Sequence, residues 1–229
     1  MDFNLWGKVR QPAGAFDPIA AIGDAVEMRF NRFGEQLVAQ GGSPWENIVA
    51  AGQAYETNTG MTTALDLAAV IAVPTTAVML AIYNGEDDGG PSLVIDSVWA
   101  LHTTAAASLA HASIIGLLGK TRVAAPTDAT PAGAHGALNG YGGKDAKTRA
   151  VVATTVDAVT GVAANWTLLS SNSVGSGVTS LPGLALFAHV NGQIIVPPGR
   201  YFGMHVLASA VGHEFNAGIR WHKRQLDLR

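Results

Sequence analysis

The C-terminal part of the chain shows the clearest alternation of apolar and polar residues. Between positions 193 and 224, three apolar runs are separated by turn-forming residues. At the first break, Pro197 and Pro198 fix φ, and Gly199 supplies the freedom that a tight turn needs. Two runs with a period of two predict half-buried antiparallel strands. Their apolar faces are Phe202, Met204, Val206 and Ala208, then Phe215, Ala217, Ile219 and Trp221, while Tyr201, His205 and Ser209 face the other way in the first run.

Similar short runs recur upstream. Gly- and Pro-rich stretches at 124–147 and 170–182 predict long loops, and no repeat of fixed period is present. Eight or nine short strands without a long helix after residue 55 predict an all-β fold, a jelly roll or β-sandwich, over residues 57–229. Besides the C-terminal strands, we expect strands at 63–73, 76–83, 92–102, 113–122, 149–159, 163–170 and 184–190, with Asn191-Gly192 as a hairpin turn.

The N-terminal stretch predicts an extended arm rather than a packed element. Residues 1–18 contain two prolines and show no regular period. Large apolar side chains in such an arm need a surface to pack on. Two surfaces are open to them, a neighbouring subunit or the arm's own domain. The candidate contact residues are Phe3, Leu5, Trp6 and Phe16 in the arm, and Trp45 further along.

Between the arm and the predicted sandwich the pattern is mixed. Residues 17–31 fit a short helix or a strand equally well. Residues 45–55 favour a short helix, because Ser43 can cap it and Glu46 completes a capping box. We therefore expect residues 1–56 to form an N-terminal arm with a short helical or strand segment.

Several motifs resemble those of a known group of proteins. They are the turn PPGRYF, the Gly-containing second turn, the terminal strand that ends in WHK, and the lead-in FGEQLVAQGGSPWENIVAAGQAYETNTG. Together they resemble jelly-roll accessory proteins of tailed-bacteriophage virions, of the capsid decoration or cement type. The resemblance implies a non-enzymatic structural protein on the capsid surface, binding capsid or other virion proteins and itself as a homotrimer.

The low charge content agrees with an assembly role. Charged residues are 14% of the chain and hydrophobic residues 48%, against about 25% charged in an average domain. Such a surface exposes apolar patches that commonly mark contacts, so we expect an oligomer; a monomer coated in Ser, Thr, Ala and Gly is the alternative. A net charge of −3 argues against a nucleic-acid partner.

The sequence indicates no membrane association. Its start has an early acid and no apolar core of a signal peptide. The most apolar stretch, 64–83, contains Asp66 and Pro74, so it predicts two strands rather than a membrane span. We expect synthesis in the host cytoplasm and a final location in the virion.

No pattern predicts catalysis or a cofactor. With no cysteine, disulfides and thiolate chemistry are excluded. By parity His189, His205 and His222 share a sheet face, which would suit a cupin-type metal centre, but cupin spacing is absent. The acids at 86–88 lack a calcium-loop pattern and predict a solvated turn. We therefore predict no catalytic, cofactor or metal site.

Five tryptophans offer a further candidate, a sugar platform. Trp99, Trp166 and Trp221 fall in predicted strands and are expected in the core, whereas Trp6 and Trp45 are better placed to contact a neighbour. Two functions remain beside capsid stabilisation. One is a tail or fibre module that binds a host glycan or receptor through the loops at 124–147 and 170–182, and the other is a cupin-like metalloenzyme.

Overall fold

The computed structural model describes most of the chain from residue 48 onward. The chain forms two compact units, Met1–Gly52 and Gln53–Arg229. Of the first unit only the end is described, where Ile48 and Val49 are helical and the Gly52 amide donates to the Val49 carbonyl at 2.9 Å. The described residues are 48–49, 51–59, 66–75, 77–104, 109–119, 121–124, 136–139, 144–155, 159, 165–173 and 184–226.

The second unit is built from β-strands, as the sequence predicts. None of the helical residues among those described belongs to a helix long and apolar enough to cross a membrane. The strands are β1 (Ala54–Asn58), β2 (Leu67–Ala68), β3 (Ala77–Asn84), β4 (Ser92–Thr104), β5 (His111–Leu118), β6 (Gly136–Asn139), β7 (Lys144–Thr155), β8 (Trp166–Ser173), β9 (Ala185–Val196), β10 (Tyr201–Ala208) and β11 (Glu214–Arg224).

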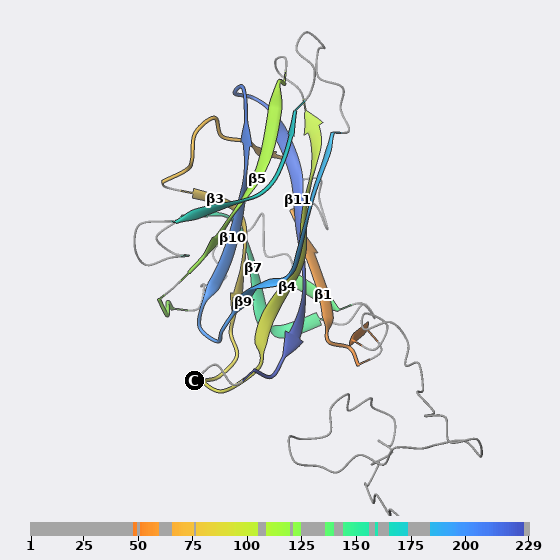
Figure 1. Ribbon diagram of the computed structural model, residues 1–229. Helices are drawn as coiled ribbons and strands as arrows, with labels where there is room; N and C mark the ends of the chain where they lie inside the picture. The colour runs from red at the N-terminus through yellow and green to blue at the C-terminus, as the bar shows by residue number, and fades with distance from the viewer. Residues whose placement is uncertain are drawn as a thin grey trace, which may run out of the picture. The chain divides into compact units, whose positions relative to one another are not determined.

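Eight of these strands pair in a nested order (Figure 1). β1 pairs with β11, β3 with β10, β4 with β9, and β5 with β8, all antiparallel. Further pairs join β11 to β4 and β10 to β5. The result is two four-stranded sheets, β1-β11-β4-β9 and β3-β10-β5-β8. Eight antiparallel strands wound in this way into two sheets form a jelly roll, a kind of β-sandwich.

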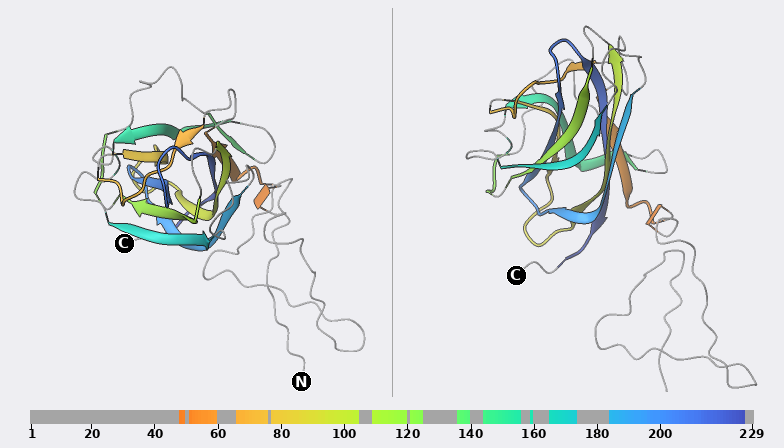
Figure 2. Two further views of the ribbon diagram at one scale, coloured as in Figure 1. Left: turned by 90° about the horizontal axis from the view of Figure 1, so that it is seen from above. Right: turned by 45° about the horizontal axis from the view of Figure 1, so that its top comes forward.

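A hairpin joins the two sheets along one side. β6 pairs with both β1 and β7, and β7 pairs with β3, so hydrogen bonding continues from one sheet to the other. On the opposite side β8 and β9 end the path of pairing. Figure 2 (left) shows the strands curving around the core, with cyan β8 beside blue β9.

The core lies between the two sheets. Its largest fully buried side chains include Trp221, Phe202 and Phe215, which all belong to the predicted apolar faces of β10 and β11. The Pro197-Pro198-Gly199 turn is also confirmed, with Gly199 at φ 75°. The half-buried prediction is wrong for β10, because both of its faces are buried: Tyr201 and His205 on the second face are 3% and 5% exposed.

The Asn191-Gly192 hairpin prediction is wrong, because these residues lie inside β9. Asn191 and Gly192 have φ of 51° and 76°. β4 pairs with β9 on both sides of them, and the register shifts between Ile95 and Ser97. Two successive left-handed residues here insert extra chain as a bulge, which bends a strand without reversing it.

Three other expectations for secondary structure need correction. Within the described part of 63–73, only Leu67–Ala68 forms a strand, because this segment crosses from one sheet to the other. The Ala69 amide donates to the carbonyl of His213, which directly precedes β11 of the first sheet. The Val70 amide donates to the carbonyl of Val206 in β10 of the second sheet. The expected helix at 45–55 gives way to β1 at residue 54, and the predicted loop at 124–147 contains β6 and the start of β7.

Candidate interaction surface

The two sheets differ in what lies on their outer faces. The outer face of β3-β10-β5-β8, here called the covered face, carries a second hydrophobic cluster. Val159 is fully buried there, and a Cβ on Gly119 would lie 2.3 Å from the Val159 carbonyl oxygen. The chain itself therefore covers this sheet. The cluster consists of Val78, Ala81, Tyr83, Leu117, Val159 and Tyr201, with Val123, Val151 and Trp166 packed against it.

The phenols of the covered face are shielded from water. The rings of Tyr83 and Tyr201 lie 4.7 Å apart between centroids. Burial, and next the neighbouring Tyr83, raise the pKa of Tyr201 above its ordinary value. The Tyr201 phenol thus stays neutral at neutral pH and serves as a packing group.

The outer face of β1-β11-β4-β9, here called the open face, exposes apolar groups. Directly paired residues lie side by side on one face of an antiparallel sheet. Phe187, Trp99 and Gly218 form one such row, and Leu101 lies two residues along β4 from Trp99. Phe187 and Leu101 are 43% and 39% exposed. The open face therefore presents aromatic and aliphatic groups to its surroundings.

Trp99 sits on this face because its neighbour has no side chain. A Cβ built on Gly218 would lie 2.3 Å from Cε2 of Trp99, so the indole occupies the space directly above that glycine. Trp99 is half-buried and lies outside the core, so the prediction that it packs in the core is wrong. The core prediction is confirmed for Trp221. Trp166 is half-buried on the covered face and donates from Nε1 to the Pro74 carbonyl at 2.9 Å.

The next row of the open face is polar. Phe187 and His189 make an edge-to-face contact with ring centroids 4.5 Å apart, and His189 pairs with Ser97. Toward β1, Nε of Arg220 lies 3.1 Å from Oε2 of Glu56. The charged side of the open face thus lies on β11 and β1, and its apolar side lies on β4 and β9.

The apolar side of the open face reaches β9, which, with β8 of the other sheet, ends the path of pairing among the described strands. We call β8 and β9 together the uncharged corner. The sequence contains no Asp, Glu, Lys or Arg between Asp157 and Arg200, a stretch that includes both strands. Leu168 on β8 is 63% exposed. Exposed edge strands normally carry charges or prolines that prevent pairing with another chain, and these two carry neither.

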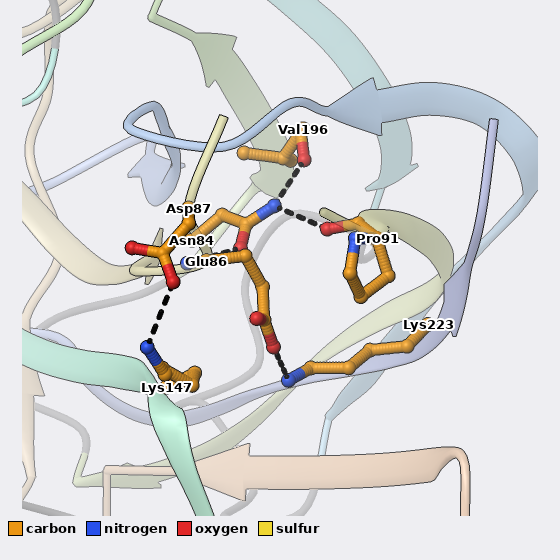
Figure 3. Close-up of polar contacts among 7 residues, drawn as sticks. All are labelled: Asn84, Glu86, Asp87, Pro91, Lys147, Val196 and Lys223. Atoms are coloured by element: carbon orange, nitrogen blue, oxygen red, sulfur yellow. Dashed lines mark hydrogen bonds and ion pairs between the residues drawn. The ribbon is translucent and has the colours of Figure 1, made fainter. Parts of the chain in front are cut away.

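The end of the sandwich where the β3–β4 loop meets the end of β9 carries polar contacts within the chain. Asn84 at the end of β3 is fully buried. Its Nδ2 donates to the carbonyls of Pro91 at 3.0 Å and Val196 at 2.9 Å, and its Oδ1 accepts from the Glu86 amide at 3.1 Å (Figure 3). A buried amide with these partners holds the β3–β4 loop against the end of β9.

The three acids of this loop each contact a cationic side chain. The pairs are Glu86 with Lys223 at 2.5 Å, Asp87 with Lys147 at 3.4 Å, and Asp88 with Arg122. The prediction of a solvated acidic turn fits Asp87 and Asp88, whose side chains are 93% and 78% exposed, and needs correction for Glu86. In the Glu86–Lys223 pair the side chains are only 16% and 11% exposed. Figure 3 shows the Glu86 and Asp87 carboxylates pointing to two different lysines, Lys223 of β11 and Lys147 of β7.

The histidines do not form the shared face that parity predicts. His205 belongs to the second sheet, whereas His189 and His222 belong to the first. Burial lowers the pKa of His205, whose Nδ1 accepts from the Val206 amide at 2.9 Å. Among the described residues, no three His, Cys, Asp or Glu side chains are grouped so that they could hold a metal ion.

Two histidine contacts were not predicted. Nε2 of His102 lies 3.1 Å from Nδ1 of His213 in a buried pair, and burial followed by the charge of His102 lowers the pKa of His213. Nδ1 of His222 lies 2.9 Å from Oδ1 of Asp96. Burial raises the pKa of the Asp96 carboxyl, and the contact with His222 partly opposes that rise. Neither pair could be predicted from a local pattern, because each joins a residue of β4 to a residue in or next to β11, far away in the sequence.

The predicted contact residues Phe3, Leu5, Trp6, Phe16 and Trp45 lie outside the described residues. The structure instead brings together Trp99, Leu101 and Phe187, which sequence reasoning did not select. For Phe187 the available signal was the long run without charge, whereas Trp99 and Leu101 lie outside that run. No family model, no curated protein and no solved structure matches this chain in sequence or fold comparisons.

Proposed function

We propose that this chain is a non-enzymatic structural protein of a bacteriophage particle, which binds and stabilises the capsid shell as an oligomer. The observation that carries the proposal is the open face with its adjoining uncharged corner. Phe187, Leu101 and Leu168 are all at least 39% exposed on a chain with only 14% charged residues. Apolar surface of this kind commonly marks a contact with another protein.

The proposed mechanism is adhesion. A protein that binds the assembled shell but not its separated subunits shifts the equilibrium toward the shell in proportion to its affinity and concentration. The rigid jelly roll supplies the contact surface, and the N-terminal residues Phe3, Leu5, Trp6, Phe16 and Trp45 are proposed as further contacts with virion proteins. The resemblance of the PPGRYF turn and the WHK strand to decoration proteins supports the same function.

Capsid binding can be measured directly. Empty capsid shells that lack the protein are mixed with the purified chain and sedimented, and the bound fraction and the temperature of shell disruption are recorded. We expect saturable binding and a higher disruption temperature. A chain without affinity for shells, whatever its own oligomeric state, would overturn the proposal.

A second function has one specific observation in its favour. Trp99 and Phe187 lie beside a row that contains Ser97 and Arg220, and aromatic rings next to hydrogen-bonding groups suit a sugar ring. A receptor or glycan-binding module of a tail or fibre would use this face. Retarded migration of the chain in gels containing host polysaccharide, lost in Trp99→Ala, would favour this function over capsid stabilisation.

A further inference from the structure

We infer that the uncharged corner is the surface on which a second copy of this chain packs. This inference rests on the proposed function, because it names the contact by which the structural protein becomes an oligomer. Three observations carry it: the unpaired edges of β8 and β9, the absence of charge along both, and the apolar side chains exposed on either side of them.

The two strands are free edges of the described sheet. β8 pairs only with β5 and β9 only with β4 among the described strands. Each therefore has one side whose backbone amides and carbonyls have no partner strand within the part of the chain that the structure describes. In β9 the Asn191-Gly192 bulge ends the regular part, so the flat edge suited to another strand is Ala185–Val190. Bulges limit the pairing of edge strands with other chains. This bulge lies C-terminal to Phe187, so the part of β9 that contains Phe187 keeps a regular edge.

The charge distribution is selective. The chain has 17 acidic and 14 basic residues, and all of them lie outside the stretch between Asp157 and Arg200. Elsewhere several of the described charges are paired within the chain, as in Glu86 with Lys223 and Glu56 with Arg220. Absence of charge at the two edges, where soluble proteins usually place it, indicates that water does not remain in contact with them.

The exposed side chains on the two sides of the corner complete the surface. Phe187 projects from β9 on the open face, and Leu168 projects from β8, where it is 63% exposed. β8 and β9 contact each other across the corner. Leu168 lies on the same face of β8 as Trp166, which belongs to the outer side of the second sheet. A partner must therefore extend around the corner to bury both Leu168 and Phe187, with Phe187 as an aromatic anchor of the kind that interfaces commonly have.

The occupant that fits is a second copy rather than a different protein. Charged groups mainly select between unlike partners, and the corner offers none for that purpose. A surface without charge also lets two copies, each with a net charge of −3, approach where repulsion is weakest. Symmetric homo-oligomers built on such self-complementary patches are the commonest assemblies of soluble proteins.

The test compares charge insertion inside and outside the corner. Phe187→Glu and Leu168→Glu place an acid on the corner, whereas Val211→Glu places one in the β10–β11 turn at a position that is equally exposed, 66%. Light scattering over a range of concentrations gives the mass of each full-length variant. We expect the wild type and Val211→Glu to be oligomers, and both corner variants to raise the dissociation constant by at least about 30-fold.

A second measurement does not depend on the folding of the charged variants. The chain has no cysteine, so Phe187→Cys and Val211→Cys each give a single thiol. We expect the thiol at 187 to react with maleimide more slowly in concentrated than in dilute solution, while the thiol at 211 reacts equally in both. Circular dichroism of every variant confirms the fold.

Two results would overturn the inference. A wild type that stays monomeric at all concentrations would remove self-association, while shell sedimentation could still support capsid binding by the monomer. An oligomer whose mass and thiol reactivity are unchanged at both corner positions would place the contact elsewhere. Failure of shell binding with an intact corner-dependent oligomer would overturn the proposed function and leave this contact standing.

Discussion

The outer faces of the two sheets have similar residues and different surroundings. On the covered face, Tyr201 and Val159 are 3% and 0% exposed, because a segment of the same chain lies over the sheet. On the open face, Phe187 and Leu101 keep 43% and 39% of their surface exposed. The comparison teaches that the chain covers the apolar groups of one outer face with its own residues and leaves Phe187 and Leu101 on the other exposed.

The difference also separates stability from binding. Side chains on the covered face contribute to the folded state through burial, at about 25 cal/mol per Å² of apolar area. Side chains on the open face lose little water on folding, so they contribute mainly when a partner covers them. Substitutions at equivalent positions of the two faces should therefore change different measurements.

The largest effect is expected on the covered face. Tyr201→Ala removes a buried ring that packs on Tyr83 and should lower the free energy of unfolding by about 3–5 kcal/mol. Phe187→Ala, the matched change on the open face, should lower it by less than about 1 kcal/mol in the dissociated protein. Urea unfolding of both variants at low concentration measures the contrast. Equal losses would show that the open face is as important for folding as the covered one.

Trp99 tests how the open face is built. In Gly218→Ala the new Cβ would meet the indole, so we expect a loss of about 1–3 kcal/mol and a changed tryptophan fluorescence. The control is the same substitution combined with Trp99→Ala. In the double variant the clash is absent. In a double-mutant cycle, the coupling energy between positions 99 and 218 should therefore account for most of the stability lost in Gly218→Ala. An additive cycle would mean that the glycine serves another purpose.

Acid should act on the covered face. Burial holds the pKa of His205 below its ordinary 6.5, so the unfolded chain takes up a proton first as the pH falls. Stability contributed by neutral His205 is complete above pH 6.5 and is lost below it, by up to about 1.4 kcal/mol per pH unit. His213, whose pKa is also lowered, adds a loss of the same sign.

Urea unfolding between pH 7.5 and 5 checks this expectation. His205→Asn should reduce the slope of this pH dependence, because it removes the buried imidazole. An unchanged slope in His205→Asn would show that the burial of His205 is not the cause.

The smallest effect concerns the segment that flanks the covered face. Trp166→Phe removes the bond from Nε1 to the Pro74 carbonyl and leaves that carbonyl without this donor. We expect a loss of about 1 kcal/mol and faster hydrogen exchange around residues 71–75. Leu168→Ala on the same strand, at an exposed position, is the control, and it should change neither measurement in the monomer.

The sequence predicts the elements well where the pattern is local. The period of two in 201–208 and 214–224, and the proline turn before them, predict strands that the structure contains. The apolar faces of these strands, with Trp221 at the end, identify core residues correctly. The same reasoning fails at 63–73. The described part of this segment crosses from one sheet to the other, so its apolar residues do not form a continuous run of strand hydrogen bonds.

The candidate surface was much less accessible to sequence reasoning. Trp99 and Trp221 both lie in strands of mixed apolar composition, yet one lies over Gly218 outside the sheet and the other fills the core. Parity along one strand gives two faces but does not say which faces inward. The long stretch without charge was visible in the sequence, but its meaning depends on the fact that β8 and β9 are both edges.

What the sequence alone determined is the all-β class, most of the longer strands and the proline turn before β10, because strand periodicity and the backbone limits of proline and glycine act over a few residues. The tertiary structure decided the nested pairing, the role of Asn191-Gly192 as a bulge, the joining of His102 to His213, and the choice of covered and open faces. These depend on contacts between residues about a hundred positions apart, such as β4 with β11, and no local pattern contains that information.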